Sequence, residues 1–272
     1  MGSYVPTTQE EQKEMLAAIG IESMADLYQN IPAQVKLNRN LEMPEGLSEL
    51  ETIKKMKKVA GKNVIFPTIF RGAGAYRHFI PSVVKQVIGK ENFLTSYTPY
   101  QAEISQGILQ SIYEFQTLIC ELTGMNVANA SVYDGATAAA ESVAMCQDKK
   151  RKKVLIAQTV SPFVIDVVKT YCFGNEMEVE LIPEDEGRCQ LDALRNQLDD
   201  SIACVYLQQP NFYGNVEQAR EIGQIVHQSK AKFIMGVNPI SLGVLQTPME
   251  CGADVAVGEG QPLGLPLAFG GP

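Results

Sequence analysis

After Tyr133, strand-like and helical segments alternate regularly along the chain, and this alternation leaves few folds open. Each strand-like run is short and apolar, and the stretches between them carry apolar residues at helical spacing. Strands are expected at 154–160, 177–182, 202–208, 233–237 and 255–257, and helices at 136–147, 162–173, 191–198 and 216–229. Apolar strands separated by amphipathic helices favour a mostly parallel sheet covered by helices, so the expected fold class is α/β.

The region before this alternation is mostly helical in pattern. Thr8 and Glu11 form a capping box that opens an expected helix at 9–19, and further helices are expected at 24–28 and 47–60. We therefore divide the chain into a helical N-terminal arm, residues 1–62, and a large α/β domain, residues 63–272. The last residues follow directly on a strand and a turn, so we expect the natural protein to continue past Pro272.

The strongest single helix is expected from Glu103 to the glycine at 124. Apolar residues recur there every three or four positions over about five helical turns, and Gly124 supplies the stop. The apolar positions are Ile104, Ile108, Leu109, Ile112, Phe115, Leu118, Ile119 and Leu122. We expect this stripe to pack in the core.

Charge and cysteine usage exclude several classes of function. The net charge is −8, and the densest basic run, 149–153, falls in a loop between a helix and a strand, so no nucleic-acid partner is expected. No apolar run approaches the ~20 residues of a membrane span, and the N-terminus lacks the apolar core of a signal peptide. Six cysteines without a CxxC pair favour free thiols in the cytoplasm, and with two histidines no metal site is expected.

Asp134, Gly135, Ala136 and Thr137 form a turn of small residues at the start of an expected helix. A helix N-terminus exposes backbone N–H groups and the positive end of the helix dipole, so this turn is a candidate phosphate cradle. The alternative is an ordinary tight turn with a capped helix.

A second candidate is the polar and aromatic stretch just before the long helix. Tyr97, Thr98, Tyr100 and Gln101 flank a proline, which suits a rigid loop that faces a ligand. A surface turn would explain the same composition.

The segment 254–272 contains no lysine, although its pattern is one in which a lysine would indicate a particular class of enzyme. A β-like run leads into a Gly/Pro-rich turn, the kind of place where α/β enzymes that use pyridoxal phosphate carry their Schiff-base lysine. Here Glu259, Gly260 and Gln261 occupy that stretch, and the last lysine is Lys232. Asn238 also stands at a strand end where an aspartate would hold the pyridine nitrogen protonated. Because only an amine forms the imine, this chain alone is not expected to do the covalent chemistry, which points to a partner subunit. An ordinary α/β domain remains the alternative.

Several stretches together resemble the P-protein family of the glycine cleavage system, the glycine dehydrogenases (decarboxylating). The resemblance is to the N-terminal half of the family's chain, which many bacteria make as a separate subunit 1. The most specific stretches are Thr-Pro-Tyr-Gln at 98–101 and Gly-Glu-Gly-Gln-Pro-Leu-Gly at 258–264. The other similar stretches are 70–81, 97–107, 114–117, 122–125, 128–131 and 133–138.

This resemblance implies the type I, aspartate-aminotransferase-like fold of pyridoxal-phosphate-dependent transferases. It also implies that the large domain is truncated before a small C-terminal domain. In the split form of the family, it implies that a lysine-bearing subunit 2 binds pyridoxal phosphate covalently in an α2β2 assembly. This chain would then hold no covalent cofactor and no catalytic residue of its own.

The implied reaction is the decarboxylation of glycine, with transfer of the aminomethyl group to the lipoyl arm of H-protein. By position in the motifs, Tyr97, Thr98, Tyr100 and Gln101 would lie at the substrate pocket or subunit interface. The degenerate cofactor-binding remnant would comprise Asp134, Gly135, Ala136, Thr137 and Asn238. A non-catalytic scaffold or binding protein derived from such an enzyme remains open. An autonomous aminotransferase or lyase would need a lysine near Gly260.

Overall fold

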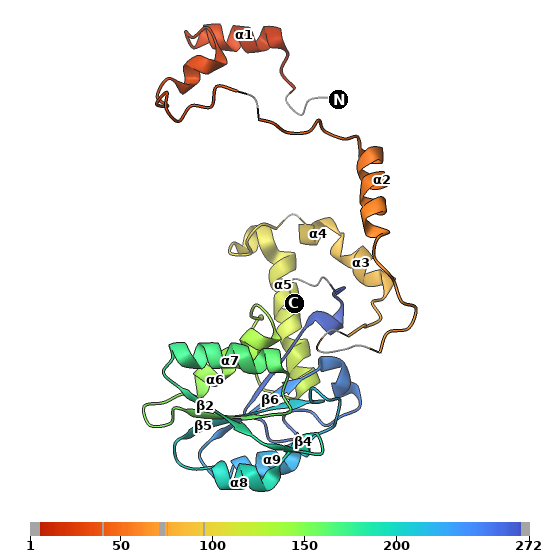
Figure 1. Cartoon of the computed structure of the whole chain (residues 1–272), viewed down its shortest axis with the longest axis vertical. Coiled ribbons are helices and arrows are strands. Elements are labelled where there is room, and N and C mark those ends of the chain that lie inside the picture. The colour runs from red at the N-terminus through yellow and green to blue at the C-terminus, as the bar shows by residue number, and fades with distance from the viewer. Residues whose placement is uncertain (1–5, 40, 71–73, 75, 95, 268–272) are drawn as a thin grey trace. The chain divides into compact units, whose positions relative to one another are not determined.

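The computed structural model describes residues 6–39, 41–70, 74, 76–94 and 96–267 (Figure 1). The chain divides into two units, Met1–Ile69 and Phe70–Pro272, and each is described by itself. Four residues of the 70–81 motif, at 71–73 and 75, lie outside the described residues. Within the described ranges, no helix is both long enough and apolar enough to cross a bilayer.

The described part of the first unit contains the α-helices α1 (Gln9–Ala18) and α2 (Glu49–Ala60) and the 3-10 helix η1 (Met24–Tyr28). The expected capping box opens α1. The Glu11 N–H donates to Thr8 Oγ1 at 3.2 Å, and the Thr8 N–H donates to Glu11 Oε2 at 2.7 Å. The helices expected in this region are therefore confirmed, with small shifts of their ends.

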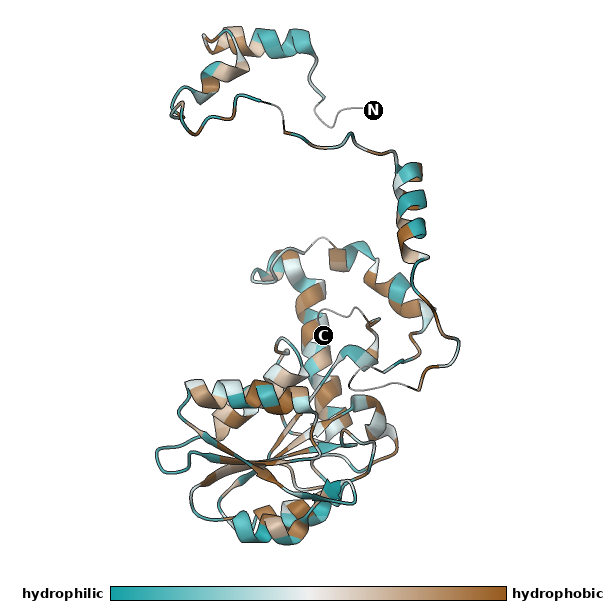
Figure 2. Cartoon of the chain, viewed as in Figure 1, coloured by the Kyte–Doolittle hydropathy of each residue, from teal (hydrophilic) through white to brown (hydrophobic). Residues whose placement is uncertain are grey.

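The second unit is built on a five-stranded sheet in the order β2-β1-β5-β6-β7. Its strands are β1 (Lys153–Ala157), β2 (Glu178–Ile182), β5 (Ile202–Gln209), β6 (Lys232–Val237) and β7 (Val255–Gly258). Every neighbouring pair runs parallel, which confirms the expected sheet. The strands are mostly brown in Figure 2 because a parallel sheet covered on both faces is apolar along its length.

Helices cover both faces of this sheet. The helices α6 (Gly135–Cys146) and α7 (Pro162–Gly174) lie on one face, and α8 (Leu191–Gln197) and α9 (Ala219–Val226) lie on the other (Figure 1). All four were expected, although α9 is shorter at both ends than the predicted 216–229. The core lies between the sheet and these helices, where the central strands β1 and β5 are almost entirely buried.

Two features of this unit were not expected from the sequence. The helices α3 (Ser82–Ile88) and α4 (Glu91–Leu94) are too short to show a periodic pattern. The strands β3 (Glu184–Asp185) and β4 (Arg188–Cys189) form an antiparallel hairpin in a stretch that reads as a polar loop. The two residues that join these strands have positive φ values of 50° and 74°, which twist the chain into a tight hairpin turn.

The long helix is present as α5 (Ala102–Thr123), and Gly124 ends it in the left-handed conformation with φ 75°. Its only buried side chains are two polar ones, whereas Ile104 and Leu118 are 69% and 66% exposed. The prediction that the apolar stripe packs in the core is therefore wrong. The reason lies in the packing: α5 has its main contacts with α4 and with the 3-10 helix η2 (Pro239–Gly243), rather than with the sheet.

Asp254 directly precedes β7, and its side chain contacts the first residues of the neighbouring strand β6. Its carboxylate accepts hydrogen bonds from the Phe233 N–H at 2.9 Å, from Lys232 Nζ at 2.9 Å and from His227 Nε2 at 3.1 Å. Partial burial on its own would raise the pKa of Asp254. The hydrogen bonds from Phe233, Lys232 and His227 outweigh that effect and hold the pKa below its ordinary value of 3.8.

Replacing Asp254 by asparagine is expected to lower the free energy of unfolding by about 1–2 kcal/mol at pH 7, because charged hydrogen bonds are lost. A carboxyl group with a depressed folded-state pKa stabilises the fold above its unfolded pKa, and this stabilisation is lost as the pH falls through the folded value. Urea unfolding should therefore show a difference between Asp254→Asn and wild type that is complete at pH 7 and shrinks below about pH 3.8.

The matched control is Asp192→Asn, which breaks an exposed pair with Arg195 on α8. It should change the free energy of unfolding by less than about 0.5 kcal/mol. A difference for Asp254→Asn that grows on acidification would contradict the proposed linkage.

Candidate functional site

The turn that opens α6 brings two carboxylates to one helix N-terminus. Asp134 is the N-cap, and its Oδ1 accepts from the Thr137 N–H at 2.7 Å. The neighbouring Gly135 N–H donates to Oε2 of Glu259 at 2.9 Å, across 124 positions of sequence. Backbone N–H groups that could bind an external anion are therefore already paired with carboxylates of this chain.

The segment after β7 closes over the same turn. The other oxygen of Glu259, Oε1, accepts from the Gln261 N–H at 3.3 Å. A Cβ added to Gly135 would lie 3.2 Å from the backbone nitrogen of Glu259 and 3.3 Å from the carbonyl carbon of Gly258. Backbone and side chain together thus occupy the space directly against the first residue of α6.

Asn238 lies beside this segment, because it follows Val237, the residue of β6 that pairs with Gly258 of β7. Its Oδ1 accepts from the Ile240 N–H at 3.0 Å and so caps η2. Its backbone carbonyl accepts from Ser241 Oγ at 2.7 Å. The amide oxygen of Asn238 is therefore engaged in its own turn.

These residues do not fit pyridoxal phosphate. A phosphate monoester carries about −1.5 to −2 charge, and it would meet two carboxylates at the α6 turn. Asn238, at the strand end where we expected an acid to hold the pyridine nitrogen protonated, is an uncharged amide, and within residues 1–272 no lysine follows Lys232. Lys232 itself stands at the start of β6, the opposite end of that strand from Asn238, where its Nζ lies 2.9 Å from Asp254 Oδ1.

The structure places the four predicted pocket residues elsewhere. Tyr97, Thr98, Tyr100 and Gln101 are exposed and lie at the N-terminal end of α5, with Tyr97 99% and Tyr100 88% exposed. Gln101 is the N-cap of α5, and α5 is kinked at Ser105, within its first turn. Among the hydrogen bonds of the described residues, none joins these four residues to the α6 turn.

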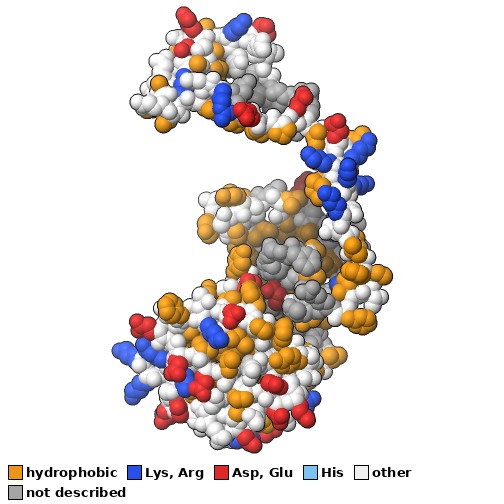
Figure 3. Space-filling model, viewed as in Figure 1, with side chains coloured by type: hydrophobic (Ala, Val, Ile, Leu, Met, Phe, Trp, Pro, Cys, Tyr) orange, Lys and Arg blue, Asp and Glu red, His pale blue; other side chains and the backbone are white. Residues whose placement is uncertain are grey.

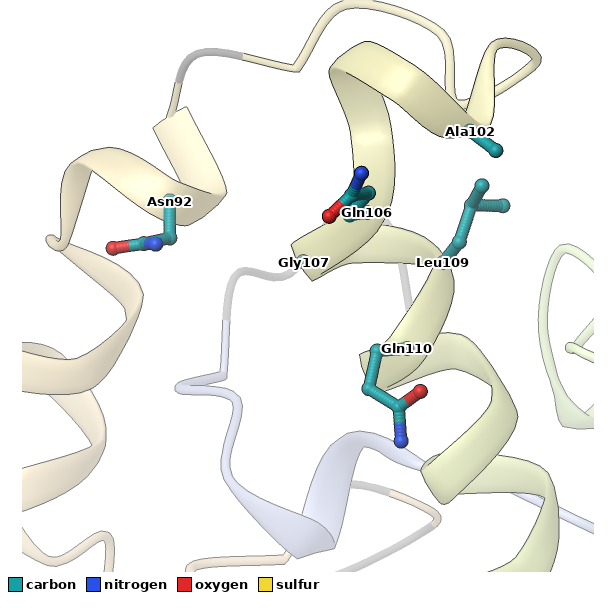
Figure 4. Close-up of a pocket in the computed structure, with 6 residues that line it drawn as sticks. All are labelled: Asn92, Ala102, Gln106, Gly107, Leu109 and Gln110. Carbon is teal, nitrogen blue, oxygen red and sulfur yellow. The ribbon is translucent and has the colours of Figure 1, made fainter.

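Beside this loop lies an open hollow of about 720 Å³ between α4 and α5 (Figure 4). Figure 4 shows Asn92 on α4 across from Gln106 on the first turns of α5, with Gln110 one turn further along. The three amides, together with Ala102, Gly107 and Leu109, give the hollow an uncharged lining of mixed polarity. The sequence did not reveal it, because the four-residue helix α4 carries no periodic signal.

The sequence did not reveal a second feature, the buried carboxylate of Glu217. Glu217 is 5% exposed, and it accepts from Thr159 Oγ1 at 2.7 Å, from Asn211 Nδ2 at 2.8 Å and from the Cys189 N–H at 3.0 Å. Thr159 and Asn211 each follow a strand by two residues, so Glu217 holds the loops after β1 and β5 and the β3–β4 hairpin together. An acidic residue before a helix gives no sequence signal for such a network.

The charged surface of this unit mixes both signs, as the blue and red side chains in Figure 3 show. Within the basic run, Arg151 pairs with Asp148 at 2.6 Å, and Lys153 pairs with Glu180. Among the described residues, no group of three or more His, Cys, Asp or Glu side chains is placed to hold a metal ion.

Comparison with known proteins gives the family. The family model described as glycine cleavage system P-protein matches residues 2–272. A relative named probable glycine dehydrogenase (decarboxylating) subunit 1, from Desulfitobacterium hafniense, is 50% identical over 99% of this chain and 61% of its own length. The chain thus spans about three fifths of the length of the curated relatives that it matches.

Solved structures agree with the family and the fold. A crystal structure of glycine decarboxylase (P-protein) of the glycine cleavage system, in inhibitor-bound form, is 39% identical with a TM-score of 0.87 and covers 100% of this chain and 61% of its own. A mutant of C-DES with glycine covalently linked to its PLP cofactor shares the fold alone, at 17% identity and a TM-score of 0.51 over 66% of this chain and 50% of its own. The fold is the type I fold of pyridoxal-phosphate-dependent enzymes, and the chain belongs to the glycine cleavage system P-protein family.

Proposed function

We propose that this chain is subunit 1 of a glycine dehydrogenase (aminomethyl-transferring). In this proposal it completes the active site of a lysine-bearing subunit 2, which decarboxylates glycine and passes the aminomethyl group to lipoyl H-protein. The assembly is an α2β2 heterotetramer in the cytoplasm. The proposed location rests on six free thiols, of which Cys172, Cys189, Cys204 and Cys251 are buried.

One observation carries the proposal. In the stretch where a Schiff-base lysine would be expected, the chain has Glu259, whose carboxylate accepts from the Gly135 N–H. A carboxylate cannot form an imine, so the imine needs an amine from outside residues 1–272. The relatives that it matches are named as a subunit 1, which supports a division of the enzyme between two chains.

The two chains would contribute different parts of the active site. Pyridoxal phosphate, bound covalently by subunit 2, would supply the electron sink for decarboxylation. This chain would contribute Tyr97, Thr98, Tyr100 and Gln101 to the shared pocket or its entrance. Their exposure in the isolated chain leaves both tyrosine rings free to contact a neighbouring subunit. Tyrosine suits such a position because its ring packs against apolar groups while its hydroxyl forms hydrogen bonds.

Glycine-dependent exchange of labelled bicarbonate in the presence of H-protein tests the proposal. The full-length version of this chain, the lysine-bearing subunit and their mixture are assayed separately. We expect exchange in the mixture and none with this chain alone, because only the partner supplies the amine. Exchange by this chain alone would show that the chain carries its own Schiff-base lysine, at a position other than the one considered. An inactive mixture with a competent second subunit would favour the non-catalytic scaffold or binding protein.

A further inference from the structure

We propose that Glu259 is a built-in anion that closes this chain's own cofactor site. Its carboxylate takes the position at the N-terminus of α6 that a phosphate would need. The degenerate site is then sealed rather than empty. The inference does not depend on the proposed function, because it concerns this chain in the absence of any partner.

The first support is the hydrogen-bond geometry. Glu259 spans two separate turns, since Oε2 accepts from the Gly135 N–H at 2.9 Å and Oε1 accepts from the Gln261 N–H at 3.3 Å. Both oxygens of the carboxylate are thus held by backbone N–H groups, as the oxygens of a bound anion are. Gln261 is also buried, at 8% exposure, which fixes the second turn.

The second support is charge. α6 has 12 residues, so its N-terminus carries the positive end of a full helix dipole, and a negative group there is stabilised. Asp134 and Glu259 both place carboxylates at this end. A third negative group, such as a phosphate, would be repelled by both while it competed for the same N–H groups.

The third support is steric. A Cβ on Gly135 would lie 3.3 Å from Cβ of Glu259 and 3.2 Å from its backbone nitrogen. Glycine at 135 is therefore suited to a close approach of the 258–259 segment, and that approach brings the Glu259 carboxylate onto the Gly135 N–H. Gly258 in turn lies so close to β6 that an added Cβ would be 2.5 Å from the Val237 carbonyl oxygen, so the segment cannot easily shift away from β6.

The test uses the full-length version of this chain alone, with inorganic phosphate as the probe and chloride at equal ionic strength as its reference. Glu259→Ala should melt about 2–4 °C below wild type, because the carboxylate on the helix N-terminus is lost. Phosphate should restore at least half of that loss, whereas chloride should not, since an anion that binds only the folded state stabilises it. Wild type should show only the smaller, general stabilisation that phosphate gives a folded protein relative to chloride.

The matched control is Glu250→Ala. Glu250 also accepts from a backbone N–H, that of Thr247 at 2.9 Å, but it lies away from α6. Its removal should not create a response to phosphate. Equal stabilisation of wild type and Glu259→Ala by phosphate would overturn the proposal, as would a Glu259→Ala protein that phosphate does not stabilise.

A second variant covers the case in which Glu259→Ala does not fold. Glu259→Ser removes the charge and is too short to reach the Gly135 N–H, but it keeps a hydroxyl that can hydrogen-bond within its own turn. The phosphorus resonance of inorganic phosphate should broaden in its presence and stay sharp with wild type, because the Gly135 N–H is freed and one of the two repelling carboxylates is gone. A resonance that stays sharp with Glu259→Ser, or that broadens equally with wild type, would count against the proposal.

Discussion

Replacing Gly223 by alanine is expected to lower the free energy of unfolding by about 3 kcal/mol. This glycine lies in α9, and a Cβ added there would collide with the Cys251 carbonyl oxygen and lie 3.2 Å from Phe233 Cδ1. Phe233 is fully buried in β6, so neither neighbour can move without opening the core. Overpacking of this kind costs about 1–3 kcal/mol and occasionally more. Urea unfolding followed by circular dichroism measures the loss.

Gly174→Ala is the matched control for this substitution. Gly174 is also a helical glycine, at the end of α7, but no atom lies within 4 Å of an added Cβ. Alanine there should leave the free energy of unfolding unchanged or raise it by up to about 1 kcal/mol, because it restricts the unfolded chain. Equal effects of the two substitutions would mean that α9 does not approach the turn at Cys251 as closely as described.

Replacing Glu217 by alanine is also expected to have a large effect and to lower the free energy of unfolding by about 3 kcal/mol. The carboxylate accepts from Thr159, Asn211 and the Cys189 N–H. Its removal takes the acceptor from the Thr159 hydroxyl and the Cys189 N–H, whereas Asn211 Nδ2 keeps its bond to the Gly187 carbonyl. Each unsatisfied buried group costs about 1–3 kcal/mol, although water that enters the space can recover part of that sum. Because the network joins two loops and a hairpin, hydrogen exchange should rise first in residues 184–189 and 210–217.

Glu221→Ala provides the comparison in the adjoining helix. Its side chain is 44% exposed and pairs with Arg195 at 3.0 Å. Exposed ion pairs contribute about 0–1 kcal/mol, so this substitution should be nearly neutral. If Glu217→Ala were equally mild, the buried network would not hold the loops at this edge of the sheet.

The sheet could be predicted because strands buried on both faces are continuously apolar, and β5 and β6 show this plainly. Helix starts were predictable where a local cap exists, as at Thr8 and Asp134. The burial of α5 was not predictable, because an apolar stripe shows that a helix has a face to cover and does not show what covers it. Short elements such as α4 carry too few residues for any period to be visible.

The candidate site was only partly predictable for a related reason. The small-residue turn at Asp134 and the absent lysine are local features, and the sequence locates both. The contact between Gly135 and Glu259 depends on the parallel register of β6 and β7, which sets where the chain emerges after Gly258. No local sequence pattern reveals a contact that depends on how strands far apart in the sequence pair with each other. The roles of Tyr97, Thr98, Tyr100 and Gln101 stay predictions.

The bond between Gly135 and Glu259 also has a consequence for synthesis on the ribosome. At about 5–20 residues per second, the 124 residues that separate the partners take roughly 6–25 s to translate. Throughout that interval the nascent α6 lacks the carboxylate of Glu259. The β6 edge lacks β7 only at the end of it, while the residues from Val237 to Gly258 are made, which takes roughly 1–4 s. An unpaired edge of this kind is a template for wrong strand pairing. The late arrival of one short strand therefore covers an open edge and neutralises a helix end in the same step.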